Sequence, residues 1–128
     1  MTKEQFNQLG KQVLDSCITV HKELGPGLLE SIYVFALLKE FDLRNIGAAH
    51  KIAVPLCYKG YNTGKFFEVD ILIENEIILE AKSVEVMHPV YSAQIISYLK
   101  LTNKKLGYLV NFNVVRLIDG FSRYVNGF

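Results

Sequence analysis

The fold is decided by two apolar runs that carry charged residues: Phe66-Phe67-Glu68-Val69-Asp70-Ile71-Leu72-Ile73 and Ile77-Ile78-Leu79-Glu80-Ala81-Lys82. We expect two adjacent strands, because the short connection between them favours an antiparallel hairpin. Side chains alternate along a strand, so Glu80 and Lys82 point to the same face and the hairpin can bring Asp70 beside them. Two carboxylates and an amine gathered at a sheet suit a divalent metal ion and an activated water better than a core.

The composition of the whole chain is that of a folded globular protein. The chain has 128 residues, half of them apolar and 21% charged, so we expect one domain over residues 1–128 with a substantial core. Lys and Arg number 14 against 13 acids, which gives a net charge of +1. Without a global basic field, nucleic-acid binding would need a local patch or a bound metal. A small enzyme with a charged site is therefore favoured over a generic DNA-binding protein.

Cysteine use and hydrophobicity bear on the cellular location. Cys17 and Cys57 fit no metal-binding spacing and have apolar neighbours, so we expect buried free thiols. Residues 1–6 lack the apolar run of a signal peptide, and no stretch approaches about 18 uninterrupted apolar residues. We expect a cytoplasmic protein that has no membrane segment.

The remaining segments predict a mixed sheet flanked by helices. Thr2 and Gln5 have the spacing of a capping box, Pro55 indicates an edge or bulged strand, and Pro89 opens a later helix. The expected helices run from the Thr2 cap to about residue 24, over 28–43 and over 90–101, and the expected strands cover 51–58, 66–73, 77–82, 106–112 and 114–118. The order ααβββαββ, with a last short segment over 121–125, predicts an α/β or α+β fold with one layer of sheet.

Asp70 and Glu80 are the first candidates for metal ligands, and the backbone carbonyl of Ala81 could add a third oxygen. Mg²⁺ commonly binds one or two protein carboxylates, keeps several waters and takes further ligands from substrate phosphate. Lys82 could orient or deprotonate the attacking water, or offset charge on a phosphate. The alternative is a structural ion pair between Lys82 and one of the acids, which would leave the other negative charge unpaired.

Two helices offer further candidates. Glu30 and Tyr33 share one helical face, although compensation of the helix dipole alone would explain a first-turn glutamate. Gln94 and Tyr98 are four residues apart on the expected third helix and could contact a substrate or a metal-bound water. The alternative for this pair is a polar helix edge whose tyrosine belongs mostly to the core.

Several motifs occur in a fixed order: Gly27-x-x-Glu30-x-x-Tyr33 within Glu23-Leu24-Gly25-Pro26-Gly27-Leu28-Leu29-Glu30, then Asp70, Glu80-Ala81-Lys82, Ala93-Gln94-x-x-x-Tyr98-Leu99-Lys100 and Leu109-Val110-Asn111-Phe112. In these motifs the chain resembles the GxxExxY family from about residue 21 onward. That family is grouped with the PD-(D/E)XK nuclease superfamily, whose core is a mixed sheet flanked by helices. The resemblance therefore implies a PD-(D/E)XK nuclease-like fold.

The resemblance also implies roles for individual residues. Asp70 resembles the metal-binding aspartate of the superfamily, Glu80 its second acid and Lys82 its catalytic lysine. Glu30 resembles an additional helix-borne acid, and Gln94 with Tyr98 resembles the Gln-x-x-x-Tyr motif, both found in the recombination-exonuclease branch and its relatives. The chain departs from the family pattern at Glu68, where a basic residue is frequent, and at Tyr91, where a histidine is frequent. Both departures concern substrate contacts more than metal binding.

Three functions remain open at this point. The first is a Mg²⁺- or Mn²⁺-dependent nuclease acting on DNA, with Asp70, Glu80 and Glu30 holding the metal. The second is a non-catalytic module of the same fold that binds a partner protein or nucleic acid. The third is a metal-dependent enzyme acting on a small phosphorylated molecule, for which we expect an enclosed pocket. A groove long enough for duplex DNA is easier to build from two copies, which favours a homodimer.

Overall fold

The computed structural model describes residues 1–128 and contains three α-helices, one short 3₁₀ helix and five strands. The helices are α1 (Lys3–Leu24), α2 (Glu30–Leu43) and α3 (Pro89–Thr102), and the 3₁₀ helix η1 covers Leu117–Gly120. The strands are β1 (Ala48–Tyr58), β2 (Tyr61–Ile73), β3 (Ile77–Lys82), β4 (Leu106–Asn111) and β5 (Phe121–Val125).

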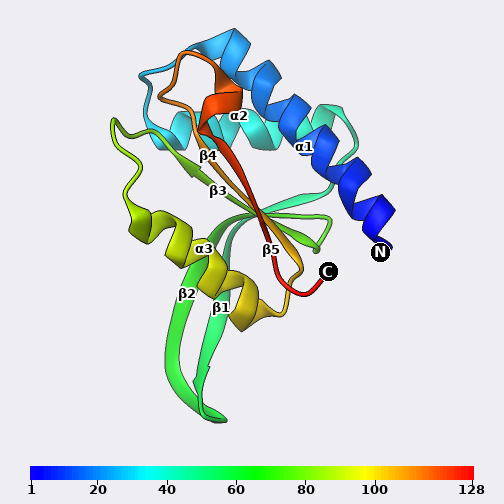
Figure 1. Ribbon diagram of the computed structural model, residues 1–128, viewed down its shortest axis with the longest axis vertical. Helices are drawn as coiled ribbons and strands as arrows, with labels where there is room; N and C mark the ends of the chain where they lie inside the picture. The colour runs from blue at the N-terminus through cyan, green and yellow to red at the C-terminus, as the bar shows by residue number, and fades with distance from the viewer.

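The strands form one mixed sheet in the order β1-β2-β3-β4-β5. Neighbouring strands are antiparallel except β3 and β4, which are parallel and are connected by α3. A parallel pair needs such a crossover because the chain must return to the end of the sheet where the first strand began before the second strand can run in the same direction. Helices α1 and α2 lie on one side of the sheet and α3 lies on the other (Figure 1). The predicted α/β fold with a helix-flanked mixed sheet is confirmed.

Each face of the sheet has its own apolar cluster. The larger cluster joins α1, α2 and one face of the sheet, and its largest buried side chains include Tyr33, Leu37, Phe41 and Phe112. The smaller cluster lies under α3 and consists of Val69, Ile78, Ile95, Leu99 and Leu109. Alternation along β3 assigns Ile77, Leu79 and Ala81 to the larger cluster and Ile78 to the smaller one. Glu80 and Lys82 therefore lie on the α3 face.

Several local signals in the sequence are confirmed. Thr2 and Gln5 form the predicted capping box at the start of α1. Pro55 lies on β1, the edge strand, next to an irregularity in pairing between Leu56 and Cys57. Pro89 begins α3, and Asn103 ends it in the left-handed conformation.

The expected strand over residues 114–118 is wrong. This segment forms bends and then η1, and the last strand is β5 (Phe121–Val125). Val115 is 92% exposed, so its β-branched side chain does not mark a buried strand. The loop crosses to α1, where the Val114 carbonyl lies 2.8 Å from Nε2 of His21. Gly120 then approaches β4 so closely that a Cβ there would lie 2.3 Å from the carbonyl oxygen of Asn111.

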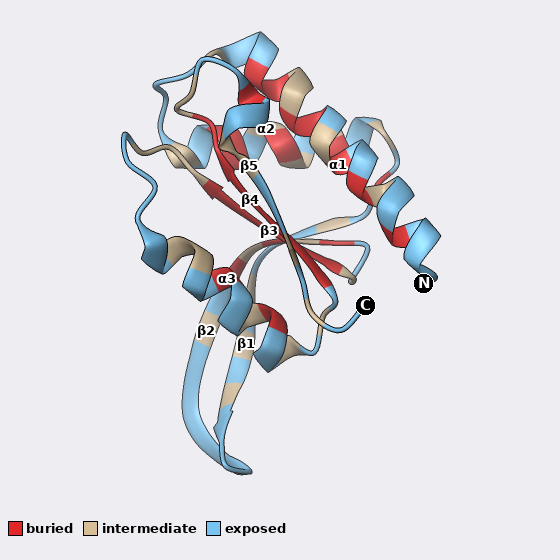
Figure 2. Cartoon of the chain, in the orientation of Figure 1, coloured by how far each residue is buried: buried red, intermediate tan, exposed pale blue.

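The outer parts of β1 and β2 extend beyond the rest of the sheet as a two-stranded hairpin arm, defined here as residues 51–67 (Figure 1). Most residues of the hairpin arm are exposed, and the remaining ones are only half-buried (Figure 2). Cys57 belongs to this arm and is exposed, which corrects the expectation of a buried thiol, whereas Cys17 is buried in α1.

Candidate active site

The site begins where the pairing of β2 with β3 ends. The ladder runs from Ile73 opposite Ile77 to Ile71 opposite Leu79, so Asp70 would face Glu80 at the next step. Instead of a regular backbone pair, the N–H of Asp70 donates to Oε2 of Glu80 (2.8 Å). The N–H of Ala81 donates to Oδ2 of Asp70 (3.1 Å). The two carboxylates thus cross-link the strands at the point where their backbones separate.

Strand β2 changes the face it presents at the same residue. Val69 belongs to the cluster under α3 and Ile71 to the cluster under α1 and α2, although a regular strand would put both on one face. On β1, Lys51 has a positive φ of 53° and no partner on β2, although its neighbours form the pairs His50–Ile71 and Ile52–Val69. Lys51 is the residue that would pair with Asp70, so the β1–β2 and β2–β3 ladders are both interrupted at Asp70.

Glu80 is the most buried charged residue of the site, with 4% of its surface exposed. Burial and the negative charge of Asp70 together raise the pKa of its carboxyl group to about 8, against the opposing effect of Lys82. Three acidic groups, Asp70, Glu80 and Glu30, act on one another here, and Lys82 is the cation that opposes them. When Glu80 is ionised, three carboxylates face one ammonium group, and this excess negative charge favours binding of a cation.

Glu30 is the first residue of α2. Burial raises the pKa of Glu30, while Lys82 lowers it and Asp70 raises it, which indicates that both charges are close. Glu30 and Asp70 line one hollow of about 300 Å³ together with Ser31, Val34, His50 and Lys51. The end of β3 lies between the start of α2 and the start of α3 (Figure 1), so both helices can contribute to the site.

Tyr33 explains how the loop before α2 is fixed. Its hydroxyl donates to the carbonyl of Gly25 (2.6 Å) and accepts from the N–H of Leu28 (3.1 Å). The ring is fully buried and stacks on Phe112 with 4.4 Å between centroids. Because Tyr33 is one turn after Glu30, this anchor fixes the position at which the helix starts. The hydroxyl of Ser83 also donates to the carbonyl of Leu28 (2.6 Å), which ties the loop to the end of β3.

Helix α3 supplies aromatic side chains on the other side of the pair. Nζ of Lys82 lies 4.9 Å from the ring centroid of Tyr91, and Lys82 makes no salt bridge. The Tyr98 ring stacks on Phe67 of β2 at 4.7 Å. Burial raises the pKa of Tyr98, and Glu80 contributes to the rise, so the phenol stays a hydrogen-bond donor. Gln94 is exposed and makes no hydrogen bond within the chain.

The oxygen atoms of the pair fit a hard divalent cation. Oδ1 of Asp70 and Oε1 of Glu80 accept no hydrogen bond within the chain, and neither is a buried atom without a partner, so both reach solvent. Two carboxylates with free oxygens are a donor set that Mg²⁺ uses in proteins. The structure contains no group of three or more His, Cys, Asp or Glu side chains placed to hold a metal. The predicted ligand set of Glu30, Asp70, Glu80 and Ala81 therefore stays a prediction.

Sequence reasoning missed one residue that shapes the site. Asn111 ends β4 and makes two hydrogen bonds with the backbone of Val84. Nδ2 of Asn111 donates to the Val84 carbonyl (2.9 Å), and Oδ1 accepts from the Val84 N–H (3.1 Å). This contact holds the chain that follows Lys82. The signal in the sequence was an asparagine at the end of an otherwise apolar strand, since an amide that becomes buried must find hydrogen-bond partners.

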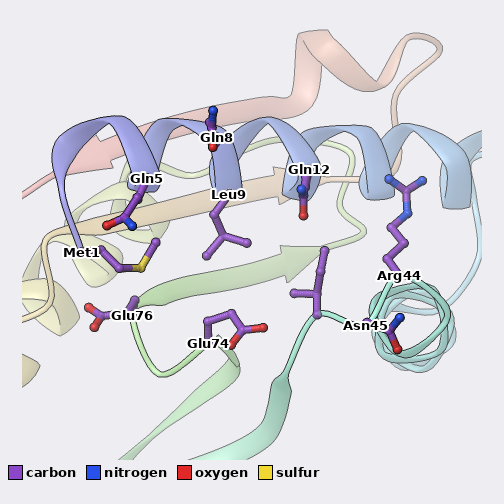
Figure 3. Close-up of a pocket in the computed structure, with 10 residues that line it drawn as sticks. Met1, Gln5, Gln8, Leu9, Gln12, Arg44, Asn45, Glu74 and Glu76 are labelled. Atoms are coloured by element: carbon purple, nitrogen blue, oxygen red, sulfur yellow. The ribbon is translucent and has the colours of Figure 1, made fainter.

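The hollow drawn in Figure 3 is separate from these residues. It lies between α1, the end of α2 and the β2–β3 turn, has a volume of about 600 Å³, and is lined by polar side chains that include Gln12, Glu74 and Glu76 (Figure 3). That turn is at the opposite end of β3 from Lys82, roughly 16 Å away along the strand. None of the predicted site residues lines this hollow.

Comparison with known families gives the class of the protein. A family model of the PD-(D/E)XK nuclease superfamily matches residues 7–124. The chain therefore belongs to the PD-(D/E)XK nuclease superfamily, which indicates a nuclease-type function and a nucleic-acid substrate. Comparison with curated proteins and with solved structures gave no match. None of the helices has the length and apolar character needed to cross a membrane.

Proposed function

We propose that this chain is a Mg²⁺- or Mn²⁺-dependent nuclease that hydrolyses phosphodiester bonds in DNA. The observation that carries the proposal is the pair Asp70 and Glu80, which cross-links two strands and keeps one oxygen of each carboxylate free. Divalent ions are general in this superfamily, and a bound ion would supply Lewis acidity and lower the pKa of a water. Asp70 and Glu80 would hold the ion, with Glu30 and the Ala81 carbonyl as further oxygen donors.

Lys82 and the aromatic residues have separate roles in this proposal. The ammonium group of Lys82 has no carboxylate within salt-bridge distance, so its charge is available to a phosphate oxygen or to the attacking water. Tyr98 keeps its proton and can donate to a phosphate oxygen. Gln94 is exposed one turn before Tyr98 and can contact the substrate. The resemblance to the GxxExxY family supports this distribution of roles.

A cleavage assay with matched variants tests the proposal. Wild type should be incubated with Mg²⁺ or Mn²⁺ on linear, circular and single-stranded DNA and on RNA, beside Asp70→Asn and Lys82→Met. Glu76→Gln is the control, since it removes a carboxylate at the other end of β3. We expect each site variant to lower the cleavage rate by roughly a hundredfold or more. Equal cleavage by wild type and the site variants would assign the activity to a contaminant and end the proposal.

A non-catalytic module is the second candidate, because one observation favours it. Each carboxylate of the pair already accepts a backbone hydrogen bond, and no three-ligand group is present, so the acids have a structural use without a metal. Such a module would bind nucleic acid or a partner protein and cut nothing.

We also propose that residues 1–128 form one domain, that the protein is cytoplasmic and that it forms a homodimer. Light scattering of the purified protein tests the homodimer.

A further inference from the structure

The hairpin arm has an unusual charge for this chain. Residues 51–67 contain Lys51, Lys59 and Lys65, all exposed, and no acidic residue. Subtracting these three charges from the net +1 of the chain leaves −2, so the basic character of the molecule is concentrated on the arm. A local basic patch of this kind favours contact with a polyanion.

The arm also exposes aromatic rings that nothing in the chain covers. Tyr58 is 56% exposed, Tyr61 78% and Phe66 65%, and Nζ of Lys59 lies 5.6 Å from the Tyr58 ring. Exposed aromatic rings beside lysines suit a partner that has both flat apolar groups and negative charges. Unpaired nucleotides have both, because their bases can stack on the rings while their phosphates meet the lysines. Paired bases cannot stack on a side chain without leaving the duplex.

The arm is continuous with the proposed site. Strand β2 carries both the outer arm and Asp70, with Lys65 five residues before Asp70. Phe67, at the base of the arm, stacks on Tyr98, whose pKa responds to Glu80 and Asp70. At the rise of an extended strand, Lys65 lies roughly 16 Å and Tyr61 roughly 30 Å from Asp70. A strand held on the arm can therefore reach the carboxylate pair.

Addition of a protein strand to the β1 edge of the arm is disfavoured. On this edge Pro55 lacks a backbone N–H, and the pairing shifts between Leu56 and Cys57. Both features obstruct a further strand. The lysines also repel the arm of a second copy.

We infer that the hairpin arm binds an unpaired nucleic-acid strand and guides it to Asp70 and Glu80. The inference rests on the proposed function, since the strand that the arm holds is the one that the site cleaves. The partner is single-stranded DNA or RNA, recognised by base stacking and phosphate contacts without reading of sequence.

Binding without metal tests the arm separately from cleavage. A fluorescein-labelled thymidine oligonucleotide of about 20 nucleotides, an RNA of the same length and a duplex are titrated in EDTA and followed by anisotropy. The arm variants are Lys65→Ala/Phe66→Ala and Lys59→Ala/Tyr61→Ala. The matched control is Lys39→Ala/Phe35→Ala on α2, which removes one exposed lysine and a phenylalanine that is 76% exposed. Thermal unfolding checks that all variants are folded.

We expect each arm variant to weaken single-strand binding by about tenfold, while the control stays within about twofold of wild type. Each lysine removed should also lower the slope of log affinity against log salt by roughly 0.7. Equal binding by the arm variants and the control would overturn the inference. So would tighter binding of the duplex, or a wild-type dimer that the arm variants dissociate. Arm-dependent binding by a protein that cuts nothing would end the nuclease proposal alone, and cleavage with arm-independent binding would end the arm alone.

Discussion

Asp70 and Glu80 exchange hydrogen bonds across two strands whose backbones have begun to separate: Glu80 accepts from the N–H of Asp70, and Asp70 accepts from the N–H of Ala81. The same carboxylates thus hold the strands together and expose oxygen atoms at the gap. Charged residues at this point of an apolar sheet consequently have a structural and a chemical use.

Metal binding should depend more strongly on Asp70 than on Glu30. Asp70 is linked to β3 beside Glu80 by a backbone hydrogen bond, whereas Glu30 reaches the site from the start of α2. We expect Asp70→Asn to weaken Mn²⁺ binding by more than about tenfold and Glu30→Gln by less. Calorimetric titration with Mn²⁺, without nucleic acid, measures both. Glu76→Gln is the control, and a larger loss with Glu30→Gln would contradict this order.

Raising the pH should destabilise the metal-free protein through Glu80. Burial and the charge of Asp70 raise the pKa of Glu80 from 4.5 to about 8, so the folded state binds the additional proton between these values. This stabilisation is complete below the unfolded pKa and is lost as the pH rises through about 8, amounting to a few kcal/mol. Urea unfolding across this range measures it. Glu80→Gln should flatten the dependence, and an unchanged slope in that variant would assign the effect to other groups.

Removing the Tyr33 hydroxyl should cost stability and activity together. Tyr33→Phe leaves the Gly25 carbonyl and the Leu28 N–H without their partner, which costs about 1–3 kcal/mol. Because the loop then holds Glu30 less firmly, cleavage should fall as well. Urea unfolding and the cleavage rate of the variant are compared with those of wild type. A stable variant with normal cleavage would show that the hydroxyl does not fix the loop.

Gly10 should tolerate no larger residue while Tyr108 keeps its hydroxyl. A Cβ at Gly10 would lie 2.0 Å from the Tyr108 hydroxyl, and Tyr108 is 4% exposed and stacked on Phe121. Gly10→Ala should therefore lower the free energy of unfolding by about 1–3 kcal/mol, although alanine favours a helix. Adding Tyr108→Phe should restore part of this loss. Additive effects in the double-mutant cycle would exclude the clash as the cause.

The parts of the fold with a clear period were predictable from the sequence. The β2–β3 hairpin followed from alternation and a short turn, and it brought Asp70 beside Glu80. The strand assigned to residues 114–118 was wrong because apolar β-branched residues there occupy a surface loop. That loop is fixed by contacts distant in sequence, from His21 and from Gly120 against β4. Local propensity contains no information about such contacts.

The geometry of the site was less predictable than its membership. Sequence spacing grouped Asp70, Glu80 and Lys82, and the resemblance to the GxxExxY family added Glu30; this membership stays a prediction. The spacing could not indicate that the β1–β2 and β2–β3 ladders are both interrupted at Asp70. Nor could it place Gln94, whose side-chain amide is exposed and makes no hydrogen bond with another residue.

The change of face at Asp70 also divides β2 into a part where packing limits substitution and a part where it does not. Ile71 and Ile73 are fully buried, so substitutions there are limited by packing. From Phe66 outward the strand is exposed, and the tip of the hairpin at Lys59 and Gly60 is an exposed turn. Residues added in pairs to both strands would preserve the alternation and leave Asp70 in place. The arm could therefore vary in length between relatives while the carboxylates stay fixed.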